Sequence, residues 1–219
     1  MLANYVTYLK FLDAKLTKFF NKQKPYIACK KGCGMCCKNA QFPYSEIEVD
    51  FLMQGAMQLD EETRSEIVSN IKKIEENKKN CKKGETFLYD CPFLINDVCS
   101  VYNYRGIACR SFGLMATSEN GRIKVPFCCF KGFNYANVID ESGEKISSEK
   151  YKASGIEEEP VAFNISYEFL TNSDFERGFN FTFGEKKPLI DWFLTEEDTV
   201  ENTSGYVTNE QDTNNISVA

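Results

Sequence analysis

Four of the ten cysteines stand close together between residues 29 and 37, in the run Cys-Lys-Lys-Gly-Cys-Gly-Met-Cys-Cys. We call residues 29–37 the first cysteine segment. Short spacers between cysteines allow a tight turn to direct several thiolates toward one metal ion or cluster. The spacing therefore predicts a metal site built from sulfur.

A second group of cysteines follows between residues 91 and 109, which we call the second cysteine segment. The adjacent pair Cys128-Cys129 stands a little farther along, and only Cys81 lies apart, in a lysine-rich stretch. Two segments that are distant in sequence can supply ligands to one centre. We therefore expect the two cysteine segments to close a common metal site.

The number of metal positions stays open at this point. Adjacent cysteines, at 36–37 and at 128–129, suit a site with one ion poorly, because successive side chains diverge in extended backbone. With more than four thiols in the two segments, either one four-iron cluster leaves spare cysteines or two metal positions exist. The cysteine count does not decide between them.

Residues beside the cysteines suit bound anionic sulfur. A zinc or ferrous ion with four thiolates has a net charge of about −2, which needs positive charge or N–H donors nearby when the site is partly buried. Basic side chains and glycine amides that could meet this need are Lys30, Lys31, Lys38, Arg105, Arg110, Gly32, Gly34 and Gly106. Plain solvation of the basic side chains is the alternative.

Composition narrows the class of protein. The chain has 219 residues, 42% of them hydrophobic, which predicts a single domain over residues 1–194 and a disordered acidic and polar tail over residues 195–219. Its net charge of −6 argues against a nucleic-acid partner. Histidine is absent, which excludes zinc hydrolase sites built on imidazole.

The N-terminal stretch over residues 1–20 carries four charged side chains among its apolar ones, so we expect neither a signal peptide nor a membrane span. A cytoplasmic location without a membrane partner is the resulting expectation. Reducing conditions there keep thiols available to metals, which makes a disulfide scaffold the weaker interpretation.

Several elements can be expected around the cysteines. Apolar residues at three- and four-residue steps predict a helix over residues 2–20. Ser45 and Glu48 form a capping-box pattern that predicts a helix start, and Asp60 caps a further helix over residues 61–79.

Downstream, Thr86–Tyr89 is a strand candidate, and Asn120-Gly121 predicts a hairpin between two β-prone runs. Residues 140–160 are polar enough for a loop, and the aromatic-rich residues 161–193 are expected to cover the metal core. The expected fold class is α+β and helix-rich, with helices around a cysteine-held metal core and a small β-hairpin.

The run C-K-K-G-C-G-M-C-C-K, followed by C-P-F-L-I-N-D-V-C-S-V-Y-N-Y-R-G-I-A-C-R-S-F, resembles the bacterial CxxCxxCC family of zinc- or iron-chelating proteins. The resemblance spans about residues 26–130. Gly106 stands where the family usually has proline, a change that removes no ligand.

This resemblance implies a set of eight metal-binding cysteines. We assign the eighth position to Cys128, with its neighbour Cys129 as the alternative, and Cys81 falls outside the pattern. The set is Cys29, Cys33, Cys36, Cys37, Cys91, Cys99, Cys109 and Cys128. No catalytic residue is assigned, and whether the chain is an enzyme stays open.

Three functions fit these patterns. The first is a cysteine-ligated metal protein that carries an iron–sulfur cluster, or iron or zinc. The second comes from the same resemblance, because the family includes flagellin lysine N-methylases: an S-adenosylmethionine-dependent methylase-like enzyme with a protein substrate. Cys29, Cys33 and Cys36 have the spacing of a radical S-adenosylmethionine site, but no series of strand–helix units supports the barrel of such enzymes. The third is a structural zinc module for interactions.

Overall fold

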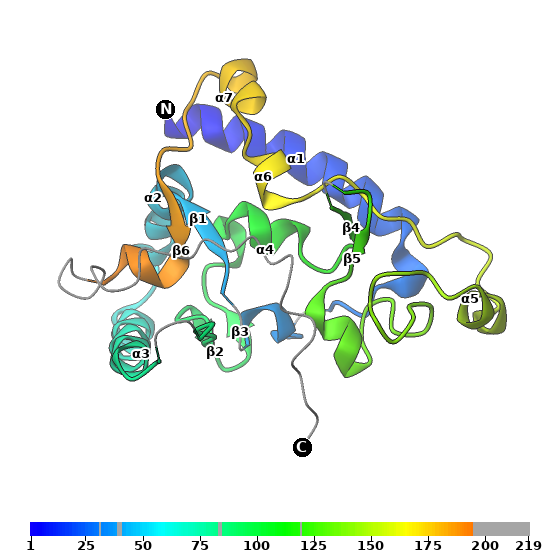
Figure 1. The fold of residues 1–219 in the computed structure, drawn as a ribbon. Helices are drawn as coiled ribbons and strands as arrows, with labels where there is room; N and C mark the ends of the chain where they lie inside the picture. The colour runs from blue at the N-terminus through cyan, green and yellow to red at the C-terminus, as the bar shows by residue number, and fades with distance from the viewer. Residues whose placement is uncertain (31, 39–40, 83–84, 119, 195–219) are drawn as a thin grey trace.

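The computed structural model describes residues 1–194 apart from residues 31, 39–40, 83–84 and 119 (Figure 1). The predicted tail over residues 195–219 lies outside the described residues. Within them the fold is α+β and rich in helix, as the sequence predicts, and its strands form short antiparallel pairs.

The longest helix is α1 (Leu2–Lys22), which runs along one side of the molecule (Figure 1). Its apolar stripe buries Tyr5, Tyr8 and Leu12, and the helix gives way to a 3₁₀ turn, η1 (Lys24–Tyr26), that contains Pro25. The helix predicted over residues 2–20 is thus confirmed. Among the described residues, no helix combines the length and the apolar character that crossing a bilayer requires.

Two further helices begin at the residues that the capping patterns indicate. Helix α2 (Glu46–Ala56) starts after Ser45, which forms the capping box with Glu48. Helix α3 (Glu61–Lys79) starts after Asp60, whose carboxylate accepts a hydrogen bond from the Thr63 amide at 2.8 Å. Each cap satisfies backbone N–H groups that have no partner within the helix.

Three antiparallel strand pairs complete the framework of the described residues. Strand β1 (Pro43–Ser45) pairs with β6 (Lys186–Pro188), which joins residues far apart in sequence. Strands β2 (Leu94–Ile95) and β3 (Val98–Cys99) form a tight hairpin. The predicted hairpin around Asn120-Gly121 is present as β4 (Ala116–Thr117) and β5 (Ile123–Lys124).

Two local predictions were wrong. Thr86–Tyr89 forms no strand, although Tyr89 is buried and packs beneath α3. Residues 140–160 contain a helix, α5 (Ser148–Ser154), because the Ser147 side chain caps its first turn and Gly155 ends it with a left-handed backbone conformation.

The remaining elements are short helical turns. They are η2 (Met35–Cys37), η3 (Tyr102–Tyr104), α4 (Ile107–Ser111), η4 (Phe127–Lys131), α6 (Tyr167–Leu170), α7 (Ser173–Phe179) and η5 (Leu189–Trp192).

The aromatic residues of the C-terminal part mostly pack on α1 instead of covering the cysteines. Phe181 and Phe183 are buried against Tyr5 and Tyr8, with ring centroids 5.6 to 6.4 Å apart. The expectation that residues 161–193 cover the cysteine core holds only near their end, where Leu189 joins a second apolar cluster that includes Cys91, Cys99 and Cys109.

Candidate metal centre

The turn η2 directs two adjacent cysteine side chains the same way. Gly34 precedes it in a left-handed conformation (φ 57°), and the Cys37 amide donates to the Gly34 carbonyl at 2.9 Å. Because this backbone is a 3₁₀ turn, the side chains of Cys36 and Cys37 do not diverge as they would in extended backbone. Their sulfur atoms lie 3.7 Å apart.

This sulfur–sulfur separation has the size that one metal ion requires. Four sulfurs placed tetrahedrally around zinc at about 2.3 Å lie about 3.8 Å from one another. Thiolates that bind different irons of a four-iron cluster lie farther apart, because inorganic sulfide and several irons stand between them. The pair Cys36-Cys37 therefore suits ligation of a single ion, which removes the objection raised by their adjacency.

The two cysteine segments lie against each other. The Cys91 amide donates to the Cys37 carbonyl at 2.7 Å, and Lys38 forms an ion pair with Asp97 at 2.5 Å. A Cβ atom on Gly34 would lie 3.2 Å from the Asp97 carbonyl oxygen, so the first segment fits closely against the turn between β2 and β3. The expected meeting of the segments is present in the fold.

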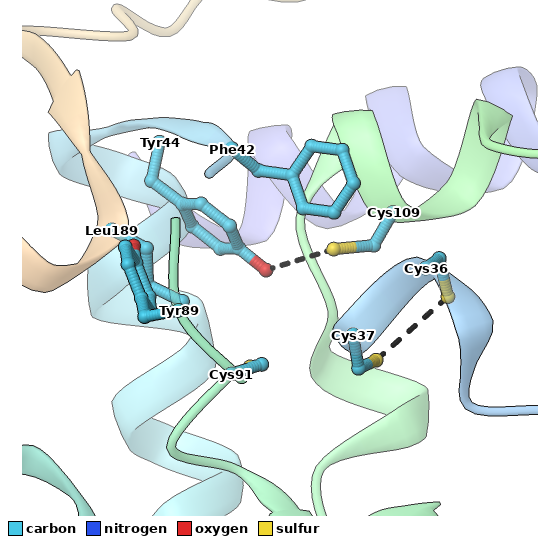
Figure 2. Close-up of a pocket in the computed structure, with 8 residues that line it drawn as sticks. All are labelled: Cys36, Cys37, Phe42, Tyr44, Tyr89, Cys91, Cys109 and Leu189. Carbon is cyan, nitrogen blue, oxygen red and sulfur yellow. Dashed lines mark hydrogen bonds between the residues drawn. The ribbon is translucent and has the colours of Figure 1, made fainter. Parts of the chain in front are cut away.

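Where they meet, the protein encloses a small cavity of about 20 Å³ (Figure 2). Four cysteines line it, two from each cysteine segment: Cys36, Cys37, Cys91 and Cys109. Aromatic and aliphatic side chains complete the wall: Phe42, Tyr44, Tyr89 and Leu189. The wall is thus sulfur on one side and almost wholly apolar on the other, a setting that keeps water away from a bound ion.

Tyr44 connects this cavity to the backbone around Cys109. Its hydroxyl accepts a hydrogen bond from the Gly106 amide at 3.1 Å and lies 3.3 Å from the Cys109 sulfur (Figure 2). The hydroxyl proton is free to point at that sulfur, which lowers the pKa of Cys109. Burial has the larger effect and raises the pKa of the Cys109 thiol to about 12.

Glu48 fixes the helix that carries Cys109. Its buried carboxylate accepts hydrogen bonds from the Ser45 amide at 2.9 Å and from the Ile107 amide, the first residue of α4, at 2.7 Å. One side chain therefore caps α2 and α4 together. A Cβ on Gly106 would lie 2.8 Å from the Glu48 carboxylate and 2.6 Å from the Tyr44 ring, so this position leaves no room for a larger residue in the present arrangement.

A second group of thiols lies outside the cavity. The Cys29 sulfur accepts a hydrogen bond from the Asn134 side-chain amide at 3.2 Å, and the Asn134 backbone amide faces the Cys128 thiol. Burial, together with nearby Cys29 and Cys33, raises the pKa of Cys128 to about 12. Two predicted ligands, Cys29 and Cys128, thus lie beside Asn134.

Cys99 and Arg105 do not line the cavity. Arg105 lies near Cys36 and Cys99 and lowers the pKa of both thiols, although burial keeps the pKa of Cys99 above its ordinary value. The Nε and Nη1 atoms of Arg105 are buried without a hydrogen-bond partner. Unsatisfied guanidinium N–H groups beside thiols fit a bound anionic metal–thiolate group, which would accept from them.

The two cysteines left over lie elsewhere. Cys129 packs among Tyr26, Met115 and Tyr135 in an apolar cluster, so of the pair 128–129 it is Cys128 that faces other predicted ligands. Cys81 lies just beyond the end of α3. Arg110, named as a possible neighbour of sulfur, instead forms an ion pair with Asp13 at 2.6 Å.

The thiols of Cys36, Cys37, Cys91 and Cys109 line the cavity, but their sulfur atoms do not all point at one position inside it. All ten cysteines are unpaired by disulfides. Among the residues that the structure describes, no group of three or more His, Cys, Asp or Glu side chains is arranged closely enough to hold an ion as it stands. Binding of a metal at the cavity therefore requires the sulfurs to turn inward by side-chain rotation.

Sequence reasoning missed Tyr44 and Asn134. Neither belongs to a cysteine motif, and they stand 65 and 105 residues from the cysteines that they contact. Glu48 was predicted as a helix cap, but its second role at α4 depends on tertiary packing that no local pattern reports.

Of the comparisons with known proteins, the one with protein-family models found a match. The CxxCxxCC family model, described as a putative zinc- or iron-chelating domain, matches residues 28–130. No curated protein and no solved structure matches the chain. The matched region spans both cysteine segments and the pair at 128–129, and it supports zinc or iron chelation as the function. Residues 28–130 of this chain thus match the model of the CxxCxxCC family.

Proposed function

We propose that the protein binds a zinc or iron ion through the thiolates of Cys36, Cys37, Cys91 and Cys109. The observation that supports this best is the cavity itself, since four sulfurs from two distant segments line one small space. Thiolate ligands favour zinc and ferrous iron among the common metals, and four of them form a closed site of the kind that stabilises a fold.

The side chains around the cavity would stabilise a negatively charged metal–thiolate group. Burial raises the pKa of the Cys109 thiol to about 12, so this thiol is protonated at neutral pH and must release its proton when it binds a metal ion. Tyr44 then donates a hydrogen bond to the Cys109 sulfur, and Arg105 supplies positive charge near Cys36. These groups would stabilise the ligands and set their orientation.

An iron–sulfur cluster is the second candidate. It is favoured by the number of thiols, because four further predicted ligands do not line the cavity: Cys29, Cys33, Cys99 and Cys128. A cluster would need more room than the present cavity of about 20 Å³ and hence a larger rearrangement. The methylase-like alternative with S-adenosylmethionine and a protein substrate stays a prediction from the resemblance alone.

Elemental analysis and absorption spectroscopy of protein purified without oxygen test the proposal. A closed thiolate site predicts stoichiometric zinc in a colourless protein, or iron with thiolate charge-transfer bands and no acid-labile sulfide. Iron with an equal amount of labile sulfide would establish the cluster instead. A folded protein that takes up neither metal from a buffered supply would refute both candidates.

A further inference from the structure

A second cavity, of about 370 Å³, lies between helix α1 and the segment that runs from η3 into α4. We call it the arginine cavity, because Arg105 and Arg110 both line it. We propose that it binds a small organic carboxylate, whose charged group is held by Arg105 and whose apolar part packs against α1. This inference goes beyond the proposed function and does not depend on which metal the cysteines bind.

Arg110 is the arginine whose charge is already matched. Its side chain is 7% exposed and forms an ion pair with Asp13 at 2.6 Å. Its Nε and Nη2 atoms donate hydrogen bonds to the backbone carbonyls of Arg105 and Asn103, each at 2.9 Å. These contacts fix the backbone that carries Arg105, so this wall of the cavity is ordered before a ligand binds.

Arg105 is the arginine whose charge is not matched. Among the residues that the structure describes, no Asp or Glu forms an ion pair with it. Its Nε and Nη1 atoms are buried without an acceptor, which costs free energy. A guanidinium group has five N–H donors, so Arg105 can bind a carboxylate in addition to supporting the nearby thiolates. An anionic ligand would supply the missing acceptor.

The ring of Tyr102 holds the Arg105 guanidinium in place. The guanidinium carbon lies over this ring, 3.7 Å from its centroid, and Tyr102 itself is 61% exposed. Stacking on an aromatic face orients the planar cation and leaves its edges available for hydrogen bonds. The edges of a guanidinium match the planar geometry of a carboxylate.

The α1 side of the cavity favours an organic ligand over an inorganic one. Leu16 is buried and Phe20 is half-buried, and both line the cavity, so it offers apolar surface beside the charged groups. One unmatched positive charge suits a carboxylate better than a phosphate, which carries a charge of about −1.5 to −2 at pH 7. Thr17 and Asn103 also line the cavity and are exposed, so a ligand can enter from solvent.

Titration of ¹⁵N-labelled protein with benzoate, followed by NMR, tests the inference directly. The Arg105 Nε–H resonance should shift as benzoate binds, because this N–H group gains an acceptor. Benzamide, which has the same ring without the charge, and inorganic phosphate, which has charge without a ring, should each bind about tenfold more weakly or worse. Absence of a shift at Arg105, or equal binding of benzoate and phosphate, would overturn the inference.

Two charge variants should change benzoate affinity in opposite directions. Arg105→Gln removes a charge-assisted hydrogen bond and should weaken binding by about 10- to 100-fold. Asp13→Asn leaves Arg110 without its carboxylate partner, so the cavity becomes more positive and binding should strengthen by about 2- to 10-fold. A gain in affinity cannot result from damage to the fold. Weaker binding in Asp13→Asn, in a chain that circular dichroism shows to be folded, would contradict the assignment.

A steric variant tests the location of the site with both arginines intact. Thr17→Trp places a large side chain at the cavity and should weaken benzoate binding by about tenfold or more. Thr7→Trp is the matched control, because Thr7 is also exposed on α1 and its hydroxyl also donates to the carbonyl four residues earlier, but it does not line the cavity. Equal loss in both variants, or unchanged binding in Thr17→Trp, would place benzoate elsewhere and overturn the inference.

Discussion

At the scale of single residues, the candidate centre depends on non-cysteine side chains that hold the sulfurs in place. Tyr44 is 2% exposed and links the Gly106 amide to the Cys109 sulfur. Glu48 is fully buried and accepts hydrogen bonds from two helix starts. Each therefore acts on the metal site through position and electrostatics.

Removal of the Tyr44 hydroxyl should weaken metal binding selectively. Tyr44→Phe keeps the ring in the cavity wall but removes the donor to Cys109 and leaves the Gly106 amide without its acceptor. Outer hydrogen bonds of this kind change metal affinity by about 10- to 100-fold. Competition with a chelator measures the effect. Tyr151→Phe, which loses a hydroxyl bonded to the Glu157 carbonyl, is the matched control and should bind zinc as the unaltered protein does.

Glu48 should make stability depend on pH in a particular direction. Burial raises the pKa of Glu48 above its ordinary value of 4.5, despite hydrogen bonds from Tyr167, Ser45 and Ile107 that lower it. The folded protein then binds more protons at this site than the unfolded chain does, so the contribution of Glu48 to stability is present below pH 4.5 and is lost as the pH rises to the raised pKa.

Glu48→Gln isolates this dependence. Glutamine cannot ionise, and its amide group faces donors where an acceptor is needed, so we expect a loss of about 1–3 kcal/mol. Urea unfolding at a series of pH values gives the difference in free energy between the two proteins. That difference should shrink as the pH rises above 4.5 and then level off. A difference that grows with pH across this window would contradict the buried-carboxylate account.

At the scale of elements, sequence patterns predicted correctly the helix starts that depend on contacts within one turn. The caps at Ser45 and Asp60 begin α2 and α3 at the predicted residues, because a side chain that satisfies free amides acts within one turn. The cap at Ser147 went unrecognised in a polar stretch, although Gly155 marks the end of that helix. Thr86–Tyr89 has strand-like residues, but in the part of the chain that the structure describes it forms no strand beyond a single bridge residue, Tyr89, because strand pairing depends on the rest of the chain.

In the candidate site, too, local sequence patterns predict some features and tertiary packing decides the others. Cysteine spacing is a local property and indicated the metal-binding region, which the family match covers. Which of the eight cysteines line the cavity depends on the packing of η2 against the second cysteine segment and of Cys29 against Asn134. The Cys37–Cys91 and Cys29–Asn134 contacts join residues 54 and 105 positions apart, beyond the reach of any motif.

The aromatic packing of α1 should stabilise the fold without a direct part in metal binding. Phe183 is 1% exposed and packs against Tyr5 and Tyr8. Phe183→Ala should therefore lower the free energy of unfolding by about 3–5 kcal/mol. Bound metal per folded chain should stay the same. The exposed Phe169 is the control, since Phe169→Ala removes less buried surface and should cost much less.

At the scale of the whole molecule, apolar packing stabilises the region around α1, and we expect bound metal to stabilise the two cysteine segments. The packing of α1 with the C-terminal aromatic residues forms one apolar cluster. The cysteine segments contribute short turns and two-residue strands, which are too small to be stable by themselves. A metal that joins those turns would contribute the folding free energy that their packing does not provide. Structural zinc contributes on the order of 10 kcal/mol in small domains.

Removal of the metal should therefore destabilise the cysteine segments more than helix α1. After chelation, amide hydrogen exchange should accelerate strongly over residues 32–38 and 91–109, where turns carry the ligands. Amides in the middle of α1 should retain more of their protection, since the apolar cluster remains. Mass spectrometry of peptides after exchange measures both. Uniform acceleration across the chain, or none at all, would contradict this division.

The most direct test of the central claim compares the metal content of Cys37→Ala and Cys91→Ala, one from each cysteine segment, with that of the unaltered protein and of Cys81→Ala. If thiolates from both segments hold the same ion, each of the two variants loses the same single equivalent, and Cys81→Ala loses none. Full metal content in Cys91→Ala, with loss only in Cys37→Ala, would show that the second segment takes no part and would contradict the account.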